Sequence, residues 1–240
     1  MRGNQKLFTA MAVSAVLVVC LFSAPTIATA VTTNLNAGQS INLATVINNN
    51  MSVWIGDKVF EGFSWDNLNA PDVAASNVDL KAILNLNDIG FRLTLQPTLT
   101  AGDTDFKDVV FEYIAAVTNS SNLISDIHLG ITGATSGDAI GSVGENAWTG
   151  GFGAGLVGHV EASLPGPPTN SVTILDYPVA KIWVTKDIIV SGNFNFDNAG
   201  EYASISTIEQ TFSQIPEPST MLLVGLGLLG VVAVNRKRKS

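Results

Sequence analysis

Three aspartates lie within six residues near the middle of the chain, and their carboxylates could bind a metal ion. Asp103, Asp105 and Asp108 belong to the stretch Asp-Thr-Asp-Phe-Lys-Asp, and Ca²⁺ prefers oxygen ligands of this kind. The stretch departs from the EF-hand calcium loop, because Lys107 and Asp108 stand where that loop needs Asp or Asn and then Gly. Two interpretations stay open, a solvated acidic turn and a loose calcium site, and no other cofactor is expected.

Residues for nucleophilic catalysis are sparse. The segment 140–144 approximates the nucleophile elbow G-x-S-x-G around Ser142, but Ile140 stands where the elbow needs a glycine. His128 and His159 are the two histidines, and no His-Glu-x-x-His motif or cysteine pair accompanies them. We therefore expect a protein that is not an enzyme. A secreted hydrolase with dispersed carboxylates remains an alternative, because the separation of such carboxylates is a spatial property.

The four tryptophans offer a second kind of chemistry. An exposed indole can stack on a sugar ring, whereas a buried indole belongs to the core. Both interpretations stay open for the four positions, so an adhesin-like module that binds carbohydrate or calcium is an alternative function. The tryptophans are Trp54, Trp65, Trp148 and Trp183.

The elements that must position these residues read as β-strands. Short runs rich in β-branched and aromatic residues recur every 10 to 15 residues, bounded by Gly, Pro, Asn and Asp. This spacing favours an all-β, antiparallel β-sandwich, of jelly-roll or immunoglobulin-like topology, over a parallel α/β sheet. In the run 179–190, Lys181 and Lys186 mark the polar positions, and the glycine-rich stretch 130–158 suggests strands with long loops. The runs are Ile41–Ile47, Lys58–Trp65, Val78–Leu84, Phe91–Leu95, Val109–Val117, Leu123–Ile131, Leu156–Ala162, Ser171–Leu175, Val179–Val190 and Ala203–Phe212.

Charge is distributed unevenly along the 240 residues. The chain has 12 basic and 20 acidic residues, a net charge of −8. Six of the basic residues lie near the two ends, so residues 31–215 keep 6 basic against 19 acidic residues, and 6 − 19 = −13. We expect no nucleic-acid partner, because phosphate neutralisation needs clustered cations. The acidic middle suits a soluble exported domain.

The N-terminus has the three parts of a secretory signal peptide. Arg2 and Lys6 precede an apolar run over residues 7–22, and Ala28 and Ala30 supply small residues at −3 and −1 of a cleavage site before Val31. We expect residues 1–30 to be removed by signal peptidase after passage through the Sec translocon. The single cysteine, Cys20, would leave with them, so the mature chain would hold no disulfide.

The C-terminus combines a short motif, an apolar span and a basic tail. The motif at 216–220 precedes an uncharged span at 221–234, which as a helix is about 21 Å long, and then a basic tail at 235–240. We expect a single transmembrane helix over the span and a cytoplasmic tail. The span matches G-x-G-x-x-G at 225–230 by coincidence, since no strand or later acidic residue accompanies it. The motif is Pro216, Glu217, Pro218, Ser219 and Thr220, and the tail contains Arg236, Lys237, Arg238 and Lys239.

This order of motif, span and basic tail resembles the PEP-CTERM sorting signal, a segment also labelled an ice-binding protein C-terminal domain. The resemblance implies an exosortase substrate of a two-membrane bacterium. Such a protein is exported across the inner membrane, held there transiently by its C-terminal helix, and sorted to the cell surface or to a biofilm and exopolysaccharide matrix. Residues 183–188 and 205–214 are loosely similar to uncharacterised β-rich domains found with this signal. The expected organisation is a signal peptide at 1–30, a β-sandwich ectodomain at 31–215 and a sorting signal at 216–240.

Overall fold

The computed structural model describes residues 31–85, 88–119, 122–166, 169–192 and 200–216. The expected signal peptide, with Ala28 and Ala30, lies outside the described residues. So do Glu217 to Thr220 of the expected motif, the expected transmembrane span and the basic tail.

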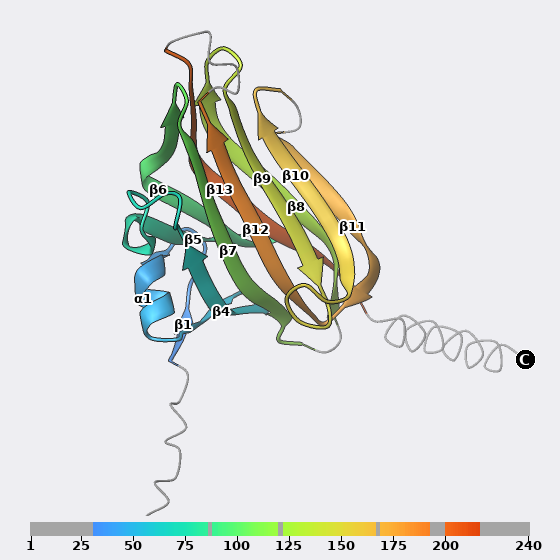
Figure 1. Cartoon of the computed structure of the whole chain (residues 1–240). Helices are drawn as coiled ribbons and strands as arrows, with labels where there is room; N and C mark the ends of the chain where they lie inside the picture. The colour runs from blue at the N-terminus through green and yellow to red at the C-terminus, as the bar shows by residue number, and fades with distance from the viewer. Residues whose placement is uncertain (1–30, 86–87, 120–121, 167–168, 193–199, 217–240) are drawn as a thin grey trace, which may run out of the picture.

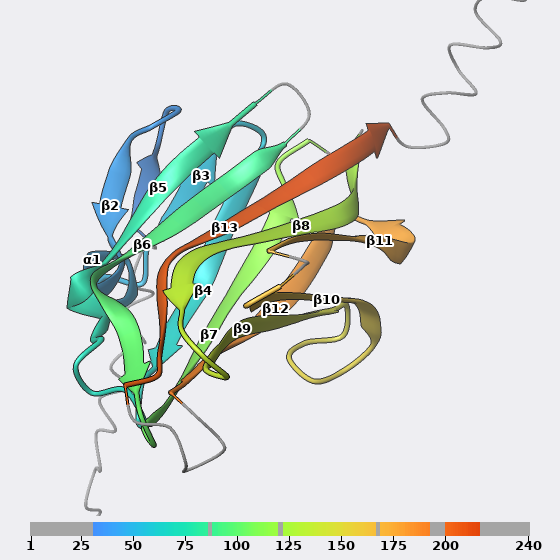
Figure 2. The same ribbon diagram turned by 90° about the horizontal axis from the view of Figure 1, so that it is seen from above.

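The described residues form two β-sheets that lie against each other (Figure 1; Figure 2). Every neighbouring pair of strands is antiparallel except β1 and β3. Sheet A has seven strands in the order β1 (Thr32–Asn34), β3 (Ser52–Ile55), β4 (Lys58–Asp66), β7 (Phe106–Val117), β12 (Lys181–Ser191), β9 (Ile140–Trp148) and β10 (Leu156–Leu164). Sheet B has six strands in the order β11 (Asn170–Val179), β8 (Asn122–Thr135), β13 (Tyr202–Pro216), β6 (Ile89–Gly102), β5 (Val78–Leu84) and β2 (Ser40–Asn42).

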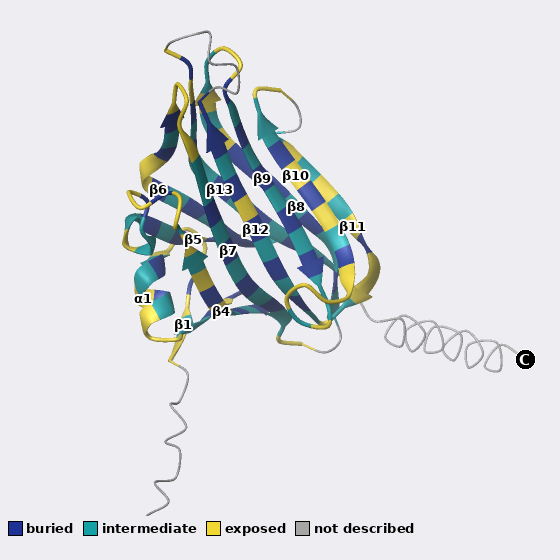
Figure 3. Cartoon of the chain, in the orientation of Figure 1, coloured by how far each residue is buried: buried dark blue, intermediate teal, exposed yellow. Residues whose placement is uncertain are grey.

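Alternation along the strands builds the core between the sheets. Buried and partly exposed residues alternate along β7 and β12, as Figure 3 shows, because successive side chains of a strand point to opposite faces. Aromatic rings from both sheets meet inside: Phe60 of sheet A lies 5.2 Å from Phe91 of sheet B in an edge-to-face arrangement. The prediction of an all-β domain is therefore confirmed.

One predicted strand was wrong. The run 41–47 is a strand only as far as Asn42, the last residue of β2, and then forms the helix α1 (Leu43–Asn48). The Asn42 side chain caps this helix by accepting a hydrogen bond from the Ala44 backbone N–H at 3.1 Å. Leu43 and Val46, three residues apart, turn to the core. A short 3-10 helix, η1 (Ala75–Asn77), precedes β5.

Strand β13 leads directly into the expected sorting motif. It occupies an inner position of sheet B between β8 and β6, and it pairs with β8 as far as Pro216 opposite Asn122. The Gln214 side chain donates a hydrogen bond to Asp57 Oδ1 at 2.6 Å, which holds the end of the strand. No loop separates the sheet from Pro216.

Candidate functional sites

A row of large side chains crosses five strands on the outer face of sheet A. Trp183 of β12 lies opposite Trp148 of β9. On one side Leu156 of β10 lies opposite Trp148, and on the other side Ile114 of β7 lies opposite both Trp183 and Glu61 of β4. These positions share one face because directly opposed residues of paired strands point to the same side of a sheet. We name this set the tryptophan row; its members are Glu61, Ile114, Trp183, Trp148 and Leu156.

Charged partners orient the centre of the tryptophan row. The Lys181 ammonium lies 4.9 Å from the Trp183 ring centroid, within cation–π range, and also 3.4 Å from a Glu61 carboxylate oxygen. Trp148 and Trp183 are each partly exposed, and the buried Trp148 Nε1 has no hydrogen-bond partner among the described residues. The row thus carries two partly exposed indoles, one of which has a buried N–H donor without a partner among the described residues.

The other two tryptophans differ in exposure: Trp54 is exposed on the sheet surface, and Trp65 packs at the edge of the core. Trp54 is 37% exposed on β3, nearer the edge of sheet A. Trp65 packs against Phe111 at 5.7 Å, and its Nε1 donates to the Val73 carbonyl at 2.9 Å. Trp65 is therefore a core-edge residue, whereas Trp54, Trp148 and Trp183 share the outer face of sheet A.

A polar row runs beside the tryptophan row, two residues away on β7, β12 and β9 and three residues away on β4 and β10, where the register shifts. Its side chains hydrogen-bond to one another: Ser64 and Thr185 donate to the two oxygens of Glu112 at 3.3 and 3.4 Å, and His159 Nδ1 lies 2.9 Å from Asn146 Oδ1. The tryptophan row offers indoles on which the apolar face of a sugar ring can pack. The hydroxyl, amide, imidazole and carboxylate groups of the polar row can hydrogen-bond to sugar hydroxyls. The members of this polar row are Ser64, Glu112, Thr185, Asn146 and His159.

The aspartates of the expected calcium site do not come together. Asp103 lies in the β6–β7 turn at φ 47°, and its Oδ1 accepts a hydrogen bond from the Gly200 N–H at 2.5 Å. Asp105 is exposed in the same turn. Asp108 lies on β7, diagonally across from Asp187 of β12. Within the described ranges no three His, Cys, Asp or Glu side chains are grouped to hold a metal ion.

Asp108 and Asp187 form a carboxyl pair on the outer face of sheet A. Removal from water, followed by the hydrogen bond and negative charge of Asp108, raises the pKa of Asp187 to about 6. A hydrolase that uses two carboxyls needs them apart, on either side of the scissile bond. Asp108 and Asp187 are diagonal neighbours on adjacent strands of one sheet face, and so do not lie on opposite walls of a cleft.

A serine, a histidine and two aspartates meet on sheet B, which the sequence did not indicate because they come from distant segments. His128 Nε2 lies 3.2 Å from Ser213 Oγ and 3.0 Å from Asp126 Oδ1, and Ser213 Oγ lies 3.0 Å from Asp88 Oδ1. A catalytic triad places serine and carboxylate on opposite ring nitrogens. Here both contact Nε2, so the group ties strand ends together and does not activate Ser213.

Ser142 likewise lacks the setting of a nucleophile. It lies within β9 on the outer face of sheet A, opposite Ile189 and Ser163. A nucleophile elbow is a sharp turn between a strand and a helix, and a regular strand position does not provide one.

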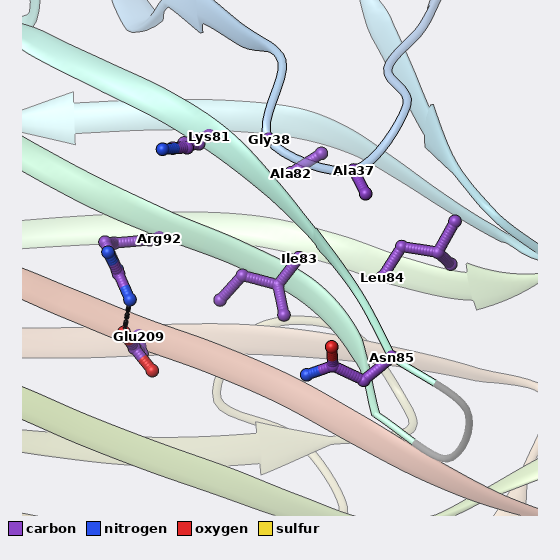
Figure 4. Close-up of a pocket in the computed structure, with 9 residues that line it drawn as sticks. All are labelled: Ala37, Gly38, Lys81, Ala82, Ile83, Leu84, Asn85, Arg92 and Glu209. Atoms are coloured by element: carbon purple, nitrogen blue, oxygen red, sulfur yellow. Dashed lines mark hydrogen bonds and ion pairs between the residues drawn. The ribbon is translucent and has the colours of Figure 1, made fainter.

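Two hollows on the outer face of sheet B share Ile83, Asn85 and Glu209 in their walls. The larger, about 340 Å³, lies between Lys81 and the Arg92–Glu209 ion pair (Figure 4). The smaller, about 240 Å³, reaches His128. No Phe, Tyr or Trp side chain lines either hollow, so neither offers a large aromatic surface for a sugar ring.

Comparison with protein families decides the nature of the C-terminus, where β13 ends. Residues 214–239 match the PEP-CTERM protein-sorting motif. The chain carries a PEP-CTERM sorting signal. The resemblance noted in the sequence is thereby confirmed, and the signal implies export and recognition by an exosortase. Among the described residues no helix is long and apolar enough to span a bilayer.

Comparisons of the whole chain are less specific. No curated protein matches its sequence. Similar solved structures include TmCBM61 in complex with β-1,4-galactotriose (TM-score 0.32, 8% identity, 65% of this chain and 88% of that one). They also include the glycosylation-associated Gap123 complex from Streptococcus agalactiae (TM-score 0.28, 9% identity, 63% of this chain and 26% of that one). A third is accessory secretory protein 1, 2 and 3 from Streptococcus pneumoniae (TM-score 0.27, 11% identity, 57% of this chain and 92% of that one). At these TM-scores the likenesses indicate no function.

Proposed function

We propose that this PEP-CTERM protein is a non-enzymatic β-sandwich that an exosortase sorts to the cell surface or the exopolysaccharide matrix, where the outer face of sheet A binds polysaccharide. The observation that carries the binding role is the cross-strand pairing of Trp183 with Trp148 beside a hydrogen-bonded polar row. The sorting signal supports the route of export.

The chemistry of the tryptophan row suits carbohydrate. A sugar ring has an apolar face, formed by its C–H bonds, that packs on an indole, and hydroxyls at its edge that seek hydrogen bonds. The polar row supplies donors and acceptors one step from the indoles, and the Lys181 ammonium adds a donor beside Trp183. The excess of carboxylates over residues 31–215 favours a neutral polysaccharide over an anionic one.

The described residues support a binding protein better than a hydrolase. Ser213 and Asp126 approach the same nitrogen of the His128 imidazole, which is not the arrangement of a catalytic triad. Asp108 and Asp187 are neighbours on one sheet face and do not flank a cleft, as two-carboxylate hydrolysis requires.

Two measurements test the proposal. The first is the C-terminal mass of the protein from cells with and without exosortase; retention of residues 221–240 in both would contradict sorting. The second is migration of the exported protein in native gels cast with neutral polysaccharides, with extracted exopolysaccharide and with none. Retardation supports binding, and equal migration in every gel contradicts it.

A further inference from the structure

Three polar side chains are fully buried together between the sheets. Lys186 of β12 and Glu145 of β9 are direct cross-strand partners whose side chains point into the core. Gln210 of β13 reaches them from the opposite sheet. The Lys186 ammonium donates hydrogen bonds to Glu145 Oε2 and to Gln210 Oε1. The sequence marked Lys186 only as a polar position, and the structure places it in the core.

The surroundings of this trio are apolar and supply few other partners. Glu145 Oε1 and the Tyr113 hydroxyl are buried with no hydrogen-bond partner among the described residues. Removal from water lowers the pKa of Lys186 and raises the pKa of Glu145, and each charge only partly offsets this effect on the other. Burial therefore favours the neutral amine and the neutral carboxylic acid.

The hydrogen bonds also place the Gln210 carbonyl group beside the Lys186 amine. Gln210 Nε2 donates to the Thr211 carbonyl at 3.4 Å, which leaves the amide oxygen directed at the Lys186 amine. The amine nitrogen thus contacts the oxygen that is bonded to Cδ, and attack requires Nζ to move from the amide plane to a position above Cδ. A neutral amine, an amide carbonyl and a carboxyl group that can carry protons are the components of a transamidation.

We propose that Lys186 and Gln210 become joined by an intramolecular isopeptide bond inside the folded domain, with Glu145 carrying the protons. This inference is independent of the polysaccharide proposal, since it concerns the core and not the outer face.

The reaction balances without an oxidant or a cofactor. Glu145 takes a proton from the Lys186 ammonium, and the amine lone pair then attacks Gln210 Cδ to form a C–N bond and a tetrahedral intermediate. The carboxyl group of Glu145 protonates the amide nitrogen and takes up the proton that Lys186 Nζ loses. The bond from Cδ to the amide nitrogen breaks, and ammonia leaves. Lysine and glutamine side chains are thus converted to one secondary amide and one ammonia molecule.

Such a bond would tie the two sheets through their inner strands. Lys186 lies on β12, between β7 and β9 in sheet A, and Gln210 lies on β13, between β8 and β6 in sheet B. The bond would close the chain segment 186–210 and restrict the unfolded state as a disulfide does. An exported domain whose mature chain is expected to lack cysteine would gain a covalent constraint in this way.

Intact mass spectrometry of the exported wild-type protein tests the proposal. We expect a mass lower than that of the processed sequence by one ammonia, and a branched peptide that joins the segments containing Lys186 and Gln210, with trypsin unable to cleave after Lys186. A folded protein with the full sequence mass overturns the proposal. Loss of one water mapped to Lys186 and Glu145, or ammonia loss mapped to another site, also overturns it.

Two variants assign the roles. Glu145→Gln keeps the side-chain volume, and we expect it to retain the full mass and no branched peptide; persistence of the link in this variant would overturn the role of Glu145. Lys186→Met removes the nucleophile and serves as the unlinked mass standard. If either variant fails to fold, judged by circular dichroism, the mass and peptide map of the wild-type protein still decide whether the bond forms.

Discussion

Trp183 and Trp148 are directly opposed partners on β12 and β9, and both lie on the outer face of sheet A. The two strands are separated in sequence by β10 and β11, so the pairing arises only when β12 inserts between β7 and β9. Lys181 lies against Trp183 on the same face. Two indoles on neighbouring strands place aromatic side chains on one sheet face, where the proposed function has successive sugar rings stack on them.

Replacing Trp183 by alanine should weaken polysaccharide binding. An aromatic contact contributes about 0.5–1.5 kcal/mol beyond the area that it buries, and the apolar area lost adds to this, so we expect affinity to fall about tenfold. Ile174→Ala is the matched control, because Ile174 is 79% exposed on the outer face of sheet B. Affinity gel electrophoresis measures both variants. Equal losses in the two variants would place the binding surface elsewhere.

Local patterns predicted most of the strands. The alternation in Phe91–Leu95 and the β-branched residues in Val78–Leu84 were enough to predict strands, because each run has one face on the core and one on the outer surface. The run 41–47 failed because Asn42 caps a helix through its side chain, an interaction that competes with strand propensity. Strand β9 was not predicted, because Gly141 and Gly144 interrupt its apolar alternation.

The candidate sites depended on information that spacing does not contain. Lys181 and Lys186 are five residues apart, so in a regular strand they lie on opposite faces; one lies on Trp183 and the other is buried. The tryptophan row depends on the register between β12 and β9. Register between strands distant in the chain follows from the whole topology, which the sequence left undecided.

Gly90 should tolerate no side chain. A Cβ at this position would lie 1.9 Å from the Gln210 carbonyl oxygen, a backbone atom that cannot move aside alone. We expect Gly90→Ala to lower the free energy of unfolding by about 2 kcal/mol or more. Gly144→Ala is the control, since a Cβ there meets nothing within 4 Å, and its change should stay within about 1 kcal/mol. Urea unfolding compares them; similar losses would contradict the close approach of β6 and β13.

The Asp108–Asp187 pair should make stability depend on pH. Asp187 has a pKa of about 6 in the folded protein against an ordinary 3.8, so the folded state binds its proton more tightly than the unfolded state. The resulting stabilisation is complete below pH 4 and is lost as the pH rises through about 6. Asp187→Asn should therefore raise the melting temperature more at pH 7.5 than at pH 4. Asp79→Asn, on β5 of the other sheet, is the control. An equal effect of Asp187→Asn at both pH values would contradict the pair.

Ser213 should be unreactive despite its contact with His128. Because Ser213 and Asp126 both approach Nε2, the imidazole cannot accept the serine proton while a carboxylate holds its far nitrogen. We expect no labelling of Ser213 by a fluorophosphonate probe under conditions that label a serine hydrolase completely. Peptide mapping checks this, and the probe found on Ser213 would favour the hydrolase alternative.

Asp57 should stabilise the end of β13 and the buried Lys58 together. The Lys58 side chain is 0% exposed and forms an ion pair with Asp57 at 3.4 Å. Asp57 also accepts hydrogen bonds from Gln214 at 2.6 Å and from Asn122 at 3.3 Å. Asp57→Asn removes the counter-charge of a buried ammonium, so we expect a loss of about 2–3 kcal/mol in the free energy of unfolding.

Burial lowers the pKa of Lys58 below 10.5, while Asp57 opposes that shift. In the folded Asp57→Asn variant Lys58 would therefore lose its proton more readily. The loss in the free energy of unfolding, relative to the wild-type protein, should then shrink as the pH rises toward 10.5. Urea unfolding at pH 7 and pH 9.5, with Asp176→Asn on exposed β11 as the control, measures both effects. If Asp57→Asn does not lower the free energy of unfolding at pH 7, or if the loss grows with pH, Asp57 does not neutralise Lys58.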